Sequence, residues 1–126
     1  MSDPLLEMIQ RVSENYEIRI SDDDIIRWAG TLNNSNFYDA VGLKIASEYQ
    51  EGRLSYTMCD TLVNELWSCV LRGFTGFKKN QVPPVFYDVF VAFDAGEYHR
   101  VPDKSDNPVA EHTDKLIHEL LVRHIY

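Results

Sequence analysis

Residues 83–96 read Pro-Pro-Val-Phe-Tyr-Asp-Val-Phe-Val-Ala-Phe-Asp-Ala-Gly, and this stretch decides the fold. Proline suits the first position of a helix and glycine the position just beyond its end, so the pattern predicts a helix from Val85 to about Ala95 that ends at Gly96. A helix with so few polar positions belongs at the centre of a fold, covered by its neighbours. Valine and aromatic residues also suit a buried strand, but the length and the prolines favour a helix.

Helical spacing of apolar residues recurs on both sides of this stretch. Only in Tyr16–Ile20 do polar and apolar residues alternate, over a short stretch, and this segment is expected to be an extended connector. The sequence therefore predicts an all-α fold over residues 1–126, a single-domain irregular bundle of about six helices. Four of the other expected helices are Pro4 to about Asn15, Asp22–Ala29, a segment carrying Phe37 to Tyr49 that ends at Gly52, and a segment from Ser55 to Gly73. The last expected helix starts at Asn107 and Pro108. Its inward-facing residues are expected to be Val109, Thr113, Leu116, Ile117, Leu120, Leu121 and Ile125.

Between the fourth and fifth expected helices, Phe74–Pro84 is expected to be a loop, because its glycine and double proline cannot continue a helix. Lys78 and Lys79 make this loop locally basic, but so few charges do not make a nucleic-acid footprint on an acidic chain. Cys59 and Cys69 lie ten residues apart on one expected helix, about 15 Å along its axis and beyond disulfide reach. We expect both to be small core residues.

Negative charge is concentrated near the start of the chain. The net charge is −8, and the first 24 residues carry seven of the twenty carboxylates against two arginines, which gives −5. Excess negative charge repels nucleic acid and anionic membranes and speeds encounter with a basic protein. The triplet Asp22–Asp24 has a local explanation, because acids are favoured at a helix N-terminus. Glu7, Glu14 and Glu17 have no such explanation.

The residues that could carry chemistry do not form a catalytic or metal-binding pattern. His118 and His124 are six residues apart, so on a helix they point about 120° away from each other and cannot share a zinc ion. We expect no metal, no cofactor and no enzyme. The polar loop from Asp94 to Asp106 contains His99 and Arg100 and could be a structural connector, a partner contact or an acid–base site.

The chain begins without the basic start and apolar run of a secretory signal, and no stretch approaches the roughly 20 apolar residues of a membrane span. The sequence therefore predicts a cytoplasmic protein with no membrane contact.

The stretch Val89–Arg100, followed by Asp106–Val109 and the last expected helix, resembles the C-terminal pattern of small helical bacterial proteins. The acidic, compact, helix-rich chain as a whole resembles immunity proteins that neutralise toxins of contact-dependent growth inhibition and related polymorphic systems. This resemblance implies a helical fold and an inhibitory protein–protein interaction, and it carries over no functional residue.

We accordingly expect a binding protein that inhibits a basic partner, such as a toxin nuclease domain. The alternatives are a small enzyme that uses the loop from Asp94 to Asp106 and a non-catalytic subunit of a larger assembly. Aromatic residues near the acidic clusters would supply apolar anchors, and Tyr16, Trp28, Tyr38 and Tyr98 are the candidates. The residues expected to contact the partner are Glu14, Glu17, Asp22, Asp23, Asp24, Trp28, Asp94, Glu97, Tyr98, Asp103 and Asp106.

Overall fold

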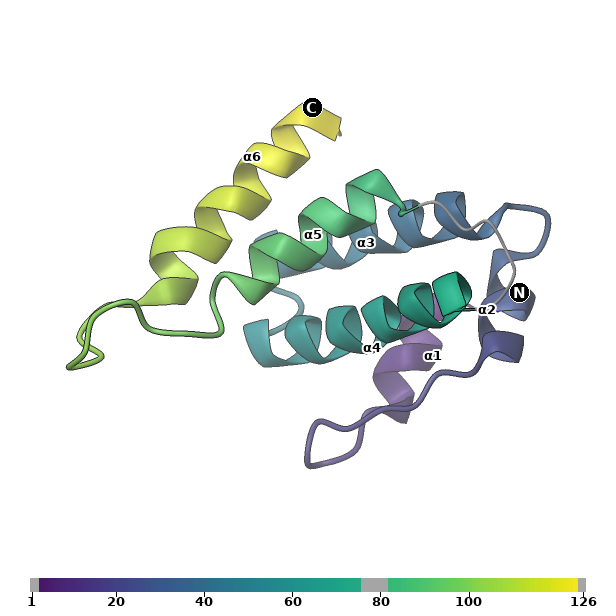
Figure 1. The fold of residues 1–126 in the computed structure, drawn as a ribbon, viewed down its shortest axis with the longest axis horizontal. Helices are drawn as coiled ribbons and strands as arrows, with labels where there is room; N and C mark the ends of the chain where they lie inside the picture. The colour runs from purple at the N-terminus through teal and green to yellow at the C-terminus, as the bar shows by residue number, and fades with distance from the viewer. Residues whose placement is uncertain (1–2, 76–81, 125–126) are drawn as a thin grey trace.

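The computed structural model describes residues 3–75 and 82–124, and in these residues the fold is all-α, without a strand (Figure 1). The predicted irregular helical bundle is confirmed. The helices are α1 (Pro4–Arg11), α2 (Asp22–Ala29), α3 (Asn34–Gln50), α4 (Tyr56–Thr75), α5 (Pro84–Asp94) and α6 (Asp114–His124), and a π-helical turn (Val109–Thr113) leads into α6. None of these helices is long and apolar enough to cross a membrane.

The first two helices differ in how well their ends were predicted. α2 occupies the predicted residues, and its capping box is formed: Ser21 Oγ accepts the Asp24 N–H, and the Asp24 carboxylate accepts the Ser21 N–H. α1 ends at Arg11 instead of about Asn15. The chain leaves the helix there because Ser13 bonds to Glu17 instead. The Ser13 N–H donates to the Glu17 carbonyl (2.9 Å), and the Ser13 hydroxyl oxygen accepts the Glu17 N–H (3.1 Å). Such local side-chain bonds compete with helix continuation.

Helices α3, α4 and α5 run side by side along the long axis of the molecule, and α6 slopes away across one end (Figure 1). Gly42 lies where α3 crosses α5 closely, since a Cβ atom there would lie 3.0 Å from the Phe86 ring of α5. Asp39 of α3 also caps α5, accepting the backbone N–H groups of Val85 (3.1 Å) and Phe86 (2.9 Å). The start of α5 is thus fixed by a side chain from another helix.

The prediction that α5 is covered on all sides is only partly right. Phe86, Val89 and Phe93 are fully buried, which confirms the central position of the helix. Tyr87 and Val91, however, are 43% and 40% exposed. Helices α3, α4 and α6 pack against α5 but do not cover the side that carries Tyr87 and Val91. An apolar strip of the central helix therefore reaches the surface.

Each of the six helices contributes to the described core, including the two free cysteines, whose predicted burial is confirmed. α4 continues to Thr75, past the predicted loop start at Phe74, and residues 76–81, including Lys78 and Lys79, lie outside the described residues. Leu116 was expected inside and is 36% exposed. Thr113, Ile117, Leu120 and Leu121 are buried as predicted, so Leu116 lies at the edge of the buried stripe of this segment. Ile125 also lies outside the described residues.

Candidate functional site

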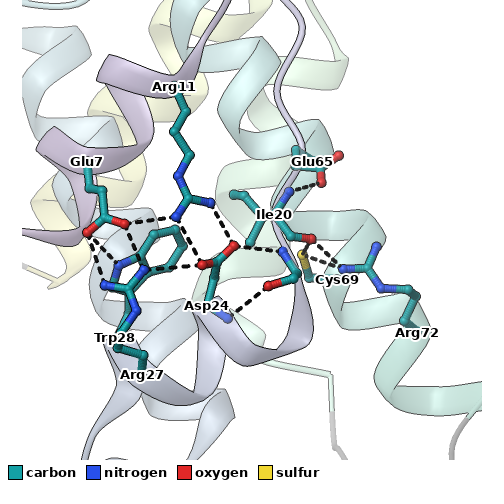
Figure 2. A network of polar contacts seen from close by, with 10 residues as sticks. Glu7, Arg11, Ile20, Asp24, Arg27, Trp28, Glu65, Cys69 and Arg72 are labelled. Carbon is teal, nitrogen blue, oxygen red and sulfur yellow. Dashed lines mark hydrogen bonds and ion pairs between the residues drawn. The ribbon is translucent and has the colours of Figure 1, made fainter.

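The carboxylates of the first helices form an ion-pair network with two arginines (Figure 2). Glu7 of α1 accepts hydrogen bonds from Arg27 of α2 (2.7 Å), from Arg11 (2.9 Å) and from the Trp28 indole N–H (3.2 Å). Asp24 accepts from Arg11 (2.7 Å) and Arg27 (3.2 Å). These charge-assisted bonds join α1 to α2.

The network lowers the pKa of both carboxyl groups. Hydrogen bonds from Arg27 and Trp28 lower the pKa of Glu7 to about 2, and the bond from Arg11 is the largest cause lowering the pKa of Asp24. The two guanidinium carbons also lie 5.2 and 5.4 Å from the centre of the Trp28 ring, within cation–π range. The acidic charge of these residues is therefore already neutralised within the chain.

The expected anchors Trp28 and Tyr38 are core residues, 9% and 3% exposed. In this conformation neither presents its ring to a partner, because Trp28 packs beside Phe37 and Tyr38 beside Phe86. Tyr16 and Tyr98 are about half exposed, at 48% and 54%. Of the four expected aromatic anchors, only these two are accessible.

The remaining N-terminal carboxylates lie at the surface. Asp22 is 3.4 Å from the guanidinium of Arg72, which also donates to the Ile20 carbonyl (2.8 Å). Glu14 and Asp23 are exposed. The Ile20 N–H donates to the Glu65 carboxylate (2.7 Å), so the connector before α2 is fastened to α4 on both sides of Ile20 (Figure 2).

The loop after α5 is held by its own polar groups. Asp106 accepts the backbone N–H of Arg100 (2.8 Å) and contacts His99 Nδ1 (2.9 Å), and the first of these bonds is the largest cause lowering its pKa. Asp103 accepts the Ser105 N–H (3.1 Å). Arg100 donates to two backbone carbonyls and lies 4.2 Å from the centre of the Tyr98 ring. Most of the side chains that suggested acid–base chemistry therefore stabilise the loop.

A partly exposed aromatic cluster lies where α4 and α5 meet. The rings of Trp67 and Phe90 stack with centroids 4.7 Å apart and planes at 18°, and Tyr87 lies 5.6 Å from Trp67. Leu71, one turn beyond Trp67, is 43% exposed, as is Tyr87. We call Trp67, Leu71, Tyr87 and Phe90 the aromatic face. The sequence did not reveal it, because every apolar residue of α5 was assigned to the core.

Carboxylates gather beside this aromatic face, around Asp60 of α4. Asp60 Oδ1 is buried without a hydrogen-bond partner, and the Asn64 amide donates to Glu97 (3.0 Å). Burial, followed by the neighbouring carboxylates of Glu97 and Asp94, raises the pKa of Asp60 to about 8. Among the described residues, no ion pair joins these three acids to a lysine or arginine. The raised pKa favours the protonated form of Asp60, which can donate a hydrogen bond to Glu97.

A cleft of about 390 Å³ connects this group to the N-terminal connector. Tyr16, Glu17, Asp60 and Asn64 are among its lining residues. Asp60, which was not expected, thus lies between expected partner contacts from distant parts of the sequence: Glu17 lines the same cleft, and Glu97 and Asp94 act on its carboxyl group. We call Glu17, Asp60, Asp94 and Glu97 the acidic edge.

No group of three or more histidine, cysteine, aspartate or glutamate residues within the described part of the chain has the geometry to hold a metal ion. No family model matches the chain, and no curated protein or solved structure has significant similarity to it.

Proposed function

We propose that this protein binds a basic protein and inhibits it, and that the partner is a toxin nuclease, which makes the chain an immunity protein acting in the cytoplasm. The observation that carries the proposal is the acidic edge. Burial and the neighbouring carboxylates of Glu97 and Asp94 raise the pKa of Asp60, and among the described residues no ion pair joins these three acids to a lysine or arginine. A cation supplied by a partner would remove this repulsion.

The electrostatic gain from such a cation is substantial. Two unit charges 4 Å apart near a protein surface attract by about 4 kcal/mol before desolvation is subtracted. At the N-terminal network the same cation would gain less, because Arg11 and Arg27 already neutralise the acids there. The net charge of −8 also attracts a basic protein over a distance and speeds its association.

A nuclease fits this description, because a surface that binds nucleic acid is rich in lysine and arginine. An acidic protein seated on that surface would compete with the nucleic acid for the same cations. Inhibition would then follow from occupancy alone and would need no catalytic residue in this chain.

The test is affinity capture with the intact protein from cells of the species that encodes it, followed by binding and activity assays on the purified partner. We expect a basic partner whose affinity falls at least tenfold between about 0.05 and about 0.5 M salt, because salt screens charge attraction. The partner should degrade nucleic acid when alone and lose that activity at equimolar inhibitor. A partner that is not basic, or whose affinity does not change with salt, would contradict the proposal.

A further inference from the structure

We infer that the basic partner docks on the aromatic face formed by Trp67, Leu71, Tyr87 and Phe90, with its cations on the acidic edge, and not on the acidic surface of α1 and α2. This inference rests on the proposed function for the nature of the partner. It moves the interface from the segment richest in carboxylates to the junction of α4 and α5.

The aromatic face has the composition of an interface centre. Tryptophan and tyrosine dominate binding energy in protein interfaces because they bury a large area with few rotatable bonds. The Trp67 ring is held by its stack on Phe90, so little side-chain entropy remains to be lost when a partner covers it. Tyr87 and Leu71, next to the stack, remain 43% exposed.

Helical spacing aligns this apolar centre with the acidic edge. On α4, Asp60, Asn64, Trp67 and Leu71 follow one another at intervals of four, three and four residues, so they form one stripe. On α5, Asp94 follows Phe90 by four residues. The Trp67–Phe90 stack joins the two stripes, and one turn nearer the start of α4 the Asn64 amide donates a hydrogen bond of 3.0 Å to Glu97, which follows α5.

This arrangement specifies the chemistry of the partner surface. It should present an apolar side chain to the aromatic face and lysine or arginine side chains about one helical turn away, opposite Asp94 and Glu97. Charge complementarity selects a basic protein over a nucleic acid or an anionic membrane, because the carboxylates repel both of these.

Two pairs of matched variants test the location with the basic partner captured by the intact protein. The first pair consists of two double variants. Leu71→Ser combined with Tyr87→Ser changes the aromatic face, and Leu6→Ser combined with Ile26→Ser is the control, which removes exposed apolar side chains from α1 and α2 (52% and 63% exposed). The second pair changes charge. Asp94→Asn combined with Glu97→Gln neutralises two residues of the acidic edge, and Asp22→Asn combined with Asp23→Asn is the N-terminal control. Circular dichroism checks that each variant is folded.

The inference predicts that each change at the α4–α5 junction raises the Kd at least tenfold and that each N-terminal control changes it less than threefold. The charge changes should also reduce the dependence of Kd on salt. If the N-terminal variants lose binding and the α4–α5 variants keep it, the partner is basic but docks elsewhere, and only this inference fails. If the aromatic face mediates a dimer of this chain that Leu71→Ser and Tyr87→Ser dissolve without weakening partner binding, the inference also fails.

Discussion

Neutralising Asp60 should make the protein more stable at neutral and alkaline pH. The pKa of this carboxyl rises from 3.8 to about 8 in the folded protein, because the group is partly buried and faces Glu97 and Asp94. The unfolded chain therefore loses this proton near pH 4, while the folded chain holds it until about pH 8. The folded state binds more protons in between, so the free energy of unfolding falls as the pH rises through this window.

The size of the effect follows from the shift. About four pKa units at 1.36 kcal/mol each set a ceiling of about 6 kcal/mol. Water reaches part of this group and screens the repulsion, so we expect Asp60→Asn to stabilise the protein by about 1 to 3 kcal/mol at pH 8. The gain should be small at pH 4, where the aspartate is neutral in the folded state and about half neutral in the unfolded one.

Urea unfolding followed by circular dichroism at pH 4, 6 and 8 measures this prediction. The exposed Asp23, changed to Asn, is the matched control and should leave the pH dependence as it is in the original protein. The reasoning is refuted if Asp60→Asn is no more stable than the original at pH 8, or if its effect is the same at all three pH values. If Asp60→Asn stabilises the protein and also weakens partner binding, the acidic edge is a binding site that lowers the stability of the folded chain.

Three further predictions concern the fold. Gly96→Ala should cost about 2 to 4 kcal/mol in urea unfolding, because the new Cβ would lie 2.4 Å from Thr113 Oγ1 and break its bond to a backbone carbonyl; a change under 1 kcal/mol would contradict the packing. Asp39→Ala should cost about 1 to 2 kcal/mol by removing the cap of α5, whereas Asp39→Asn keeps an acceptor and most of the stability. The Glu7 carboxylate should contribute stability above pH 4.5 and lose it as the pH falls through about 2, and an NMR titration with a midpoint near 4.5 would disprove its bonds to Arg27.

The sequence was informative wherever a signal is local. The local pattern indicated the helix Asp22–Ala29 with both of its ends, and the apolar residues of 83–96 indicated the central helix. Helix ends were less predictable where a competing bond decided them, as at Ser13. These features depend on residues a few positions apart, so periodicity and capping chemistry are sufficient to find them.

The candidate site depends on contacts between distant residues, and the sequence could not supply these. Glu7 and Arg27 are twenty positions apart, so the neutralisation of the N-terminal acids became evident only in the folded chain. Asp60 was not expected to matter, because its raised pKa depends on burial in the folded chain and on Glu97, 37 positions away. The sequence shows the spacing that aligns Asp60, Asn64, Trp67 and Leu71 on one side of a helix. A stripe of mixed polar and apolar residues indicates a binding surface only once α5 is known to lie beside it.

The most direct test of the docking surface is site-specific crosslinking in the native complex. A photoreactive benzoylphenylalanine replaces Leu71 on the aromatic face in one sample and Ile26 on α2 in another, and both samples are illuminated with the basic partner bound. We predict a crosslink from position 71 and none from position 26. A crosslink from position 26 without one from position 71 would contradict the account.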